Sequence, residues 1–217
     1  MKKQNLITVH TYALTQLLFK DKTEFSDIRS FNIYKKNQIY HVRNQHLSHE
    51  LNTVISHSDL AQTSYGKPYL WAHPQLVFNH SHSQHHYALA ISEHYAQIGI
   101  DVEDLSRKVR FEALAQHAFH PNELELWIKL NLSTEYWFKV WTTKEAVLKA
   151  SGLGIRISLN ELDTRVTLDS NIGICHHPAI GTWCYQNFHL PEMMLTVAWE
   201  YDESQSESVP EIDMIAH

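Results

Sequence analysis

The chain has 217 residues, of which 19% are charged and 43% hydrophobic, a balance that supports a buried core and excludes global disorder. Its formal net charge of −6 argues against a general nucleic-acid-binding protein, and no apolar run is long enough for a transmembrane helix. We therefore expect one large or two small domains, with no nucleic-acid partner and no membrane span.

Cysteine content and the N-terminal segment bear on the compartment. Two cysteines, without a CxxC spacing, are too few for a disulfide framework. Polar residues interrupt the N-terminal segment where a signal peptide would need an apolar core. Both observations favour a reduced, cytoplasmic protein.

The charge is distributed unevenly. Residues 1–50 carry a net charge of +4, whereas the remainder carries −10. A basic first quarter on an acidic protein indicates an anionic ligand near the N-terminal part, although a solvated basic surface is the alternative.

The first half of the chain alternates between strand-like and helical segments. We predict a short strand over 6–10, a helix over 40–55, a turn at 65–68, and strands over 76–78 and 87–91.

The second half opens with a strand over 97–103, in which apolar and other residues alternate cleanly. Pro121 marks a helix start, and a longer helix begins at Ser133 and ends at Gly152. Further strands are predicted over 182–188 and 194–199. Because strands and helices do not alternate regularly, the fold class is α+β.

Three segments follow from this pattern. We expect an N-terminal half over 1–98 and a C-terminal half over 99–201. Residues 202–217 contain five acidic residues and no Lys or Arg, so we predict a flexible acidic tail.

A pair of carboxylates lies on the predicted strand over 97–103. Asp101 and Glu103 are two residues apart, so their side chains project from the same strand face about 7 Å apart. Two close carboxylates repel each other unless a cation lies between them, and oxygen ligands suit Mg²⁺. The alternative is a solvated strand face.

A second set lies on the long helix. Trp141, Glu145 and Lys149 follow one another at i, i+4 steps and share one helical stripe. Glu145 could add a third metal carboxylate, and Lys149 could bind a phosphate. The alternative is an ordinary Glu–Lys pair with Trp141 in the core.

Histidines gather in one short segment, at positions 80, 82, 85 and 86. Such clustering suggests zinc, but 17 histidines are spread along the chain and no HExxH motif is present. A histidine at position 80 or 82 could instead reach a phosphate.

Taken together, these motifs resemble the 4′-phosphopantetheinyl transferase superfamily, in its longer, single-chain surfactin-synthetase-activating type. The resemblance rests on three motifs in order: Gly66-Lys67-Pro68 with Phe78-Asn79-His80-Ser81-His82-Ser83, then Gly99-Ile100-Asp101-Val102-Glu103, then Trp141-Thr142-Thr143-Lys144-Glu145-Ala146-Val147-Leu148-Lys149. It implies two pseudo-symmetric halves with the active site in the cleft between them.

The resemblance also implies site residues. Asp101, Glu103 and Glu145 would hold Mg²⁺, Glu145 would also act as general base, with Glu103 as the alternative, and Lys149 would act on the pyrophosphate. Coenzyme A would be bound further by Lys67, Pro68, Ser81 and His82, with Arg29 or Arg43 at its 3′-phosphate. Glu123 is interpreted first as a helix N3 residue and second as a site residue.

The implied reaction moves the phosphopantetheine arm of coenzyme A onto a serine of an apo acyl or peptidyl carrier protein and releases adenosine 3′,5′-bisphosphate. One chain carrying both halves implies a monomer. Two alternatives stay open, a Mg²⁺-dependent phosphohydrolase and a non-enzymatic, histidine-rich metal-binding module.

Overall fold

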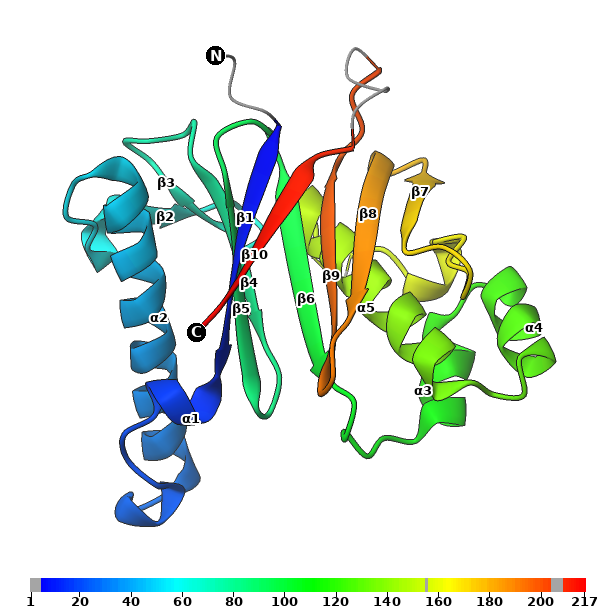
Figure 1. Cartoon of the computed structure of the whole chain (residues 1–217), viewed down its shortest axis with the longest axis horizontal. Helices are drawn as coiled ribbons and strands as arrows, with labels where there is room; N and C mark the ends of the chain where they lie inside the picture. The colour runs from blue at the N-terminus through cyan, green and yellow to red at the C-terminus, as the bar shows by residue number, and fades with distance from the viewer. Residues whose placement is uncertain (1–4, 155, 204–208) are drawn as a thin grey trace.

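The computed structural model describes residues 5–154, 156–203 and 209–217. A first four-stranded sheet has the order β10-β1-β5-β4. Its strands are β1 (Leu6–Ala13), β4 (Val77–His82), β5 (His86–Ser92) and β10 (Glu211–Ala216). The long helix α2 (Ile28–Leu51) covers the side of this sheet that lies away from the rest of the chain (Figure 1).

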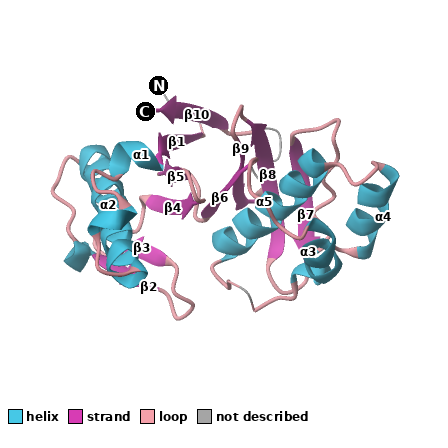
Figure 2. Ribbon diagram, turned by 90° about the horizontal axis from the view of Figure 1, so that it is seen from below, coloured by secondary structure: helices cyan, strands magenta, loops and turns pink. Residues whose placement is uncertain are grey.

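A second four-stranded sheet has the order β6-β9-β8-β7 and is antiparallel throughout. Its strands are β6 (Ile98–Asp104), β7 (Ile172–His177), β8 (Gly181–His189) and β9 (Met193–Glu200). Helix α5 (Thr134–Ser151) lies against it, with α3 (Phe111–Ala118) and α4 (Pro121–Lys129) beyond (Figure 2). Each half is thus a sheet with one long helix, which confirms the α+β prediction.

Small elements complete the chain. The short helix α1 (Leu14–Leu17) follows β1, and the hairpin of β2 (Leu60–Gln62) and β3 (Pro68–Leu70) lies beside α2. Single 3₁₀ turns occupy Lys22–Glu24, His57–Asp59 and Leu159–Glu161.

Strand β6 is buried on both faces because it lies where the two halves meet. Its Ile98, Ile100 and Val102 side chains join a core formed with β1, β5 and β9. Its other face, which carries Gly99 and Asp101, turns toward α5, so the alternative of a solvated strand face does not hold for Asp101.

Gly99 allows α5 to approach β6 closely. A Cβ atom at this position would lie 2.1 Å from the Ala146 carbonyl oxygen and 2.5 Å from the Ala150 nitrogen. No side chain fits there, so the glycine sets the distance between the strand that carries Asp101 and the helix that carries Glu145.

Helix α5 is also fixed at its ends and along its length. Ser133 caps the first turn by accepting a hydrogen bond from the Tyr136 amide, and Gly152 ends the helix at φ 71°, as expected. The Thr142 hydroxyl lies 2.7 Å from that of Thr196 on β9, to which Asn187 also donates.

Two sequence predictions need correction. Helix α2 begins twelve residues before the predicted start at 40, because Asp27 caps it by accepting a hydrogen bond from the Ser30 amide. The predicted flexible tail is wrong for Glu211–Ala216, which form β10 and pair in parallel with β1. Part of the predicted tail, 204–208, lies outside the described residues.

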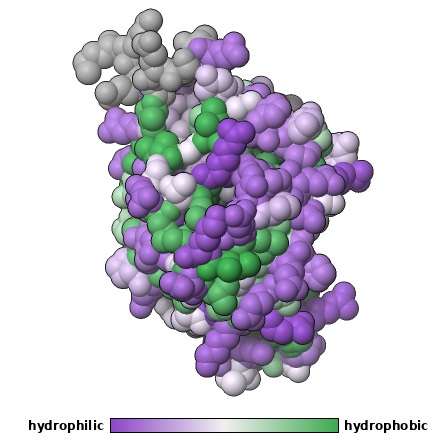
Figure 3. Space-filling model, turned by 90° about the vertical axis from the view of Figure 1, so that its right-hand side faces the viewer, coloured by the Kyte–Doolittle hydropathy of each residue, from purple (hydrophilic) through white to green (hydrophobic). Residues whose placement is uncertain are grey.

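Among the described residues no helix is both long and apolar enough to cross a lipid bilayer. Cys175 and Cys184 are free thiols. The face at the right of Figure 1, seen in Figure 3, carries apolar patches between polar side chains. At this end Ile128 on α4 and Ile172 and Ile174 on β7 are exposed.

Candidate active site

A cavity of about 790 Å³ lies between α2 and α5, over the adjoining strands β4 and β6. Helix α2 supplies a wall with Lys35, Lys36 and Tyr40, and β4 supplies Ser81 and His82. The remaining lining comes from β6, α5 and the segment after β6, namely Asp101, Val102, Glu103, Arg107, Trp141, Glu145 and Lys149.

Asp101 lies at the centre of this lining and is only 4% exposed. Its Oδ1 atom accepts hydrogen bonds from Lys149 Nζ at 2.6 Å and from Ser81 Oγ at 2.9 Å. Its Oδ2 atom is buried and has no hydrogen-bond partner among the described residues. A buried carboxylate oxygen without a donor is costly, so this atom is suited to a cation.

Glu103 is held at the cavity edge by two donors. Its Oε1 atom accepts a hydrogen bond from Trp141 Nε1 at 3.0 Å and forms an ion pair with Arg107. Burial and the charge of Asp101 nevertheless raise the pKa of Glu103 above its ordinary value, against the opposing effect of Arg107.

Glu145 projects from α5 into the same cavity. Burial and the charge of Asp101 raise its pKa, whereas Lys149 and Arg107 lower it. A cation among Asp101, Glu103 and Glu145 would relieve the repulsion that raises both glutamate pKa values.

The three carboxylates line one cavity, but their oxygen atoms do not converge on a single position. Among the described residues their oxygens do not all lie within 4.8 Å of one another, the spacing that a group of metal ligands would show. The ammonium group of Lys149 instead neutralises Asp101. These residues could hold a hard divalent cation once Lys149 gives up this contact.

Opposite the carboxylates, α2 presents positive charge. Lys35 and Lys36 both line the cavity, and Lys35 Nζ donates to the Ser83 carbonyl oxygen at 3.3 Å. This is where the basic first quarter of the sequence meets the acidic second half. The cavity can therefore take a ligand that carries both phosphate groups and a metal ion.

A second cavity of about 230 Å³ is lined by the segment with Lys67 and Pro68, which was expected to bind coenzyme A. Tyr65, Gly66, Lys67 and Pro68 line it together with the end of α5. His80 and Lys149 line both cavities, so the two are neighbours.

Lys67 makes an unexpected set of contacts. Its Nζ atom donates to Gln97 Oε1 at 2.5 Å, to the Ala150 carbonyl oxygen at 2.7 Å and to the Ile98 carbonyl oxygen at 3.2 Å. Burial lowers its pKa to about 8. Lys67 thereby links the two halves at the wall of the second cavity.

Arg43 and Glu123 lie elsewhere. Arg43 is 3% exposed, with its guanidinium group 4.4 Å from the ring centre of Tyr40, and it does not line the large cavity among the described residues. Arg29 is exposed in the first turn of α2 and likewise lies outside that lining.

Glu123 has a structural role. It accepts the His120 amide hydrogen bond of a helix cap and forms a buried ion pair with Lys144 at 2.8 Å. Its first interpretation, as a helix N3 residue, is thus confirmed.

Among the described residues, the histidines at 80, 82, 85 and 86 belong to no group with the spacing of metal ligands. His86 Nδ1 lies 2.7 Å from Asp104 Oδ1, and the same carboxylate accepts the amide hydrogens of Gln84 and His85, which shapes the turn between β4 and β5. Burial, with Arg43 and Lys149 close by, lowers the pKa of His80 to about 3, so its ring is neutral.

Sequence reasoning missed Arg107 and Tyr40 as lining residues. Arg107 follows a turn in which its amide donates to the Asp104 carbonyl oxygen, and this turn brings it back over Glu103 and Trp141. The basic run just after the acidic strand was the available signal for Arg107. Tyr40 was placed at the start of the predicted helix over 40–55, so the preceding turns of α2 that lead to the cavity were not foreseen.

The family model of the 4′-phosphopantetheinyl transferase superfamily matches residues 97–199. A 4′-phosphopantetheinyl transferase of Nostoc sp., HetI, is 42% identical over 109 residues, covering 48% of this chain and 45% of its own length. A 4′-phosphopantetheinyl transferase of Bacillus subtilis is 33% identical over 112 residues, covering 51% and 48%, respectively.

The 4′-phosphopantetheinyl transferase gsp of Aneurinibacillus migulanus is 35% identical over 102 residues, covering 46% of this chain and 40% of its own length. The chain spans about half the length of the curated relatives that it matches. The matches confirm the resemblance, and the matched range of the family model contains Asp101, Glu103, Glu145 and Lys149.

Proposed function

We propose that this chain, whose residues 97–199 match the 4′-phosphopantetheinyl transferase superfamily, transfers the 4′-phosphopantetheine arm of coenzyme A to a serine of an apo acyl or peptidyl carrier protein. The reaction requires Mg²⁺ and releases adenosine 3′,5′-bisphosphate. The observation that carries the proposal is the buried Oδ2 atom of Asp101, which has no hydrogen-bond partner in the described part of the chain and lies in a cavity with two glutamates on one side and two lysines on the other.

The donor set fits Mg²⁺. Asp101, Glu103 and Glu145 offer oxygen atoms only, and burial together with the charge of Asp101 raises the pKa values of both glutamates, an effect that a bound cation would oppose. When bound, Mg²⁺ would neutralise phosphate oxygens and orient the displacement.

The residues of this chain have distinct roles in the proposal. Lys35, Lys36 and Lys149 bind the phosphates, and Lys149 stabilises the charge that develops on the leaving group. Ser81 holds Asp101 in place through its hydroxyl group. Lys67, Pro68 and His82 line the cavities for the rest of coenzyme A, with His80 between the two.

Glu145 is the proposed general base for the serine hydroxyl. A carboxylate with a raised pKa is a better proton acceptor near neutral pH. Glu103 is less available because Trp141 and Arg107 both donate to its Oε1 atom.

Arg43 is not proposed as a direct ligand of the 3′-phosphate, since its guanidinium group is buried against Tyr40 and donates to Asn44. Lys36 is the better candidate for that contact because it lines the cavity. A monomer suffices, because one chain supplies both sides of the cavity, and a cytoplasmic location stays a prediction.

The test is incubation of an apo carrier protein with this protein, coenzyme A and Mg²⁺, followed by mass spectrometry of the carrier. Transfer adds about 340 Da, the mass of the phosphopantetheine arm. Consumption of coenzyme A without a mass gain would support the phosphohydrolase instead. Zinc binding without any dependence on coenzyme A would support the metal-binding module.

A further inference from the structure

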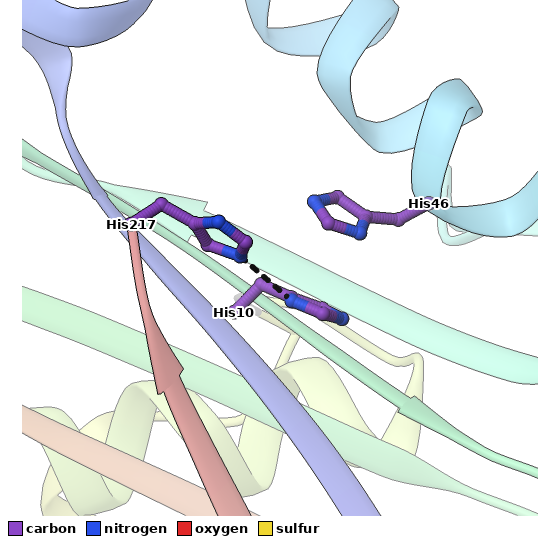
Figure 4. Close-up of side chains that lie close together, drawn as sticks. All are labelled: His10, His46 and His217. Atoms are coloured by element: carbon purple, nitrogen blue, oxygen red, sulfur yellow. Dashed lines mark hydrogen bonds between the residues drawn. The ribbon is translucent and has the colours of Figure 1, made fainter. Parts of the chain in front are cut away.

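Three histidines from distant parts of the sequence meet beside the first sheet, away from the lining of the candidate active site (Figure 4). His10 lies on β1, His46 on α2, and His217 follows β10. One possible ligand atom from each residue can be chosen so that all three lie within 4.8 Å of one another. Among the described residues this is the group that meets the spacing of a metal site.

The His10–His217 pair already has the nitrogen separation of two metal ligands, whereas the stacked rings of His10 and His46 would have to turn before both could point a nitrogen at one ion. His10 Nδ1 lies 3.1 Å from His217 Nε2, and the rings of His10 and His46 stack with centres 3.8 Å apart. Zinc–nitrogen bonds of about 2.0–2.1 Å place neighbouring ligand nitrogens roughly 3.3 Å apart in a tetrahedral site. The widest pair, which lies within 4.8 Å, therefore has to close by at most about 1.5 Å, and side-chain rotation of half-buried His46 and exposed His217 can supply this.

The two ring nitrogens of His10 differ in their surroundings. Its Nδ1 atom faces His217 Nε2 and is the candidate ligand atom. The residue is 6% exposed, and its Nε2 atom is buried without a hydrogen-bond partner among the described residues.

Tyr12 positions the other two rings. Its hydroxyl group lies 2.6 Å from His46 Nε2, and its ring stacks on that of His217 with centres 4.3 Å apart. Metal-binding histidines are commonly oriented through the ring nitrogen that does not bind the metal, and the contact between Tyr12 and His46 is of this kind.

We propose that His10, His46 and His217 form a second metal site that binds Zn²⁺ or a similar transition-metal ion through three imidazole nitrogens. The proposal is independent of the transferase activity and of the Mg²⁺ carboxylates. Imidazole ligands suit zinc, copper and nickel, whereas Mg²⁺ prefers oxygen. Three protein ligands leave the fourth position of a tetrahedral ion for water or another ligand.

Such an ion would fasten β10 to β1 and α2. Strand β10 is held by its pairing with β1 at an edge of the sheet, and the His217 amide donates to the Thr11 carbonyl oxygen at 3.0 Å. Because His217 and His46 would bind the same ion, the ion would link the end of β10 to helix α2. The site would thus stabilise the last strand rather than take part in transfer.

The test compares zinc binding in four versions of the full chain without a histidine tag: the wild type, His46→Gln, His217→Gln and His41→Gln. His41 lies on the exposed face of the same helix α2, so it controls for the loss of one histidine. Each protein is freed of metal and dialysed against Zn²⁺ with a competing chelator, and bound zinc is counted by elemental mass spectrometry.

We expect the wild type and His41→Gln to retain one zinc ion more per chain than His46→Gln and His217→Gln. Zinc should also slow amide hydrogen exchange in Glu211–Ala216 of the wild type and not of His217→Gln. Equal zinc binding in all four proteins would overturn the proposal and leave the three rings as a stacked, hydrogen-bonded contact.

Discussion

Lys149 Nζ lies 2.6 Å from Asp101 Oδ1, which joins the long helix of the second half to the strand at the boundary between the halves. Asp101 is buried, whereas the Lys149 side chain is 31% exposed and borders both cavities. The lysine thus neutralises the carboxylate in the free protein and is still able to reach a ligand. When a substrate phosphate binds Lys149 and a divalent cation binds Asp101, the two side chains would no longer pair with each other. The phosphate would replace the carboxylate as the partner of Lys149, and the cation would replace the ammonium group as the partner of Asp101.

Lys149→Met should lower turnover of carrier-protein modification by about 10²–10³-fold, because removing one preorganised charge from a transition state has effects of this size. The substitution keeps the stem length and the helix propensity, so folding should be preserved. Steady-state kinetics with a carrier protein measure the effect.

Lys129→Met is the matched control for this variant. Lys129 also pairs with a carboxylate, that of Glu125 at i, i−4, but on the exposed surface of α4. Turnover of the control should match the wild type. Lys149→Met activity within threefold of the wild type would return Lys149 to a purely structural role.

Asp101→Asn should abolish Mg²⁺-dependent activity while changing the melting temperature only slightly. The amide keeps the shape and can still contact Ser81, but it removes the charge that a cation requires. Asp101 is buried rather than on the surface, so the isosteric variant is a better test than alanine, which would leave Lys149 without its partner. Near-normal turnover at limiting Mg²⁺ would contradict the metal assignment.

The acid limb of the pH–activity profile should lie above the ordinary glutamate pKa of 4.5, because burial and Asp101 raise the pKa of Glu145. The base must be ionised, so activity falls as the pH drops through this raised pKa. Measuring kcat/KM against pH for the wild type and Glu145→Gln tests this. An unchanged acid limb with high activity in the variant would rule out Glu145 as the base.

The same shift has a consequence for stability. A carboxyl group whose pKa is raised by folding contributes stability that is fully present below its unfolded pKa and lost as the pH rises through its folded pKa. Glu145→Gln should therefore stabilise the metal-free protein relative to the wild type at pH 7 and lose that advantage below pH 4.5. Denaturant melts at both pH values would check the sign, and an advantage independent of pH would contradict it.

Lys144→Met should destabilise the fold by about 3–5 kcal/mol, because it leaves Glu123 buried without its ionic partner. Lys144 also donates to the carbonyl oxygens of Leu159 and Leu162, so the segment after α5 should loosen. Lys149 lies five positions further along the same helix, and replacing the two lysines should have opposite effects. Lys144→Met should lose stability but keep its turnover per folded molecule at low temperature, whereas normal stability would contradict the structural role.

Much of the site was predictable because its residues follow local periodicity. The alternation around Asp101 placed the carboxylate on one strand face, and the i, i+4 steps from Trp141 to Lys149 placed three side chains on one helical stripe. Caps at Ser133 and Gly152 gave the bounds of the helix. These signals need no knowledge of distant contacts.

The errors come from long-range packing. Residues 211–216 looked like an acidic tail, yet Ile212 and Met214 pack against the core between the sheets by pairing with a strand some two hundred residues earlier. In α2 the buried Arg43 lies between Ile39 and Leu47 on the inward-facing stripe of the helix. Because an arginine interrupts this stripe, the sequence does not show a continuous apolar pattern there. Arg43 was expected at a phosphate because its charge is visible in the sequence and its burial is not.

The most direct test of the account is the mass of an apo carrier protein after incubation with this protein, coenzyme A and Mg²⁺, run in parallel with Asp101→Asn. The account predicts a gain of about 340 Da with the wild type, no gain without Mg²⁺ and none with the variant. An unmodified carrier across a panel of acyl and peptidyl carrier proteins, with folded wild-type protein and both co-substrates present, would contradict it.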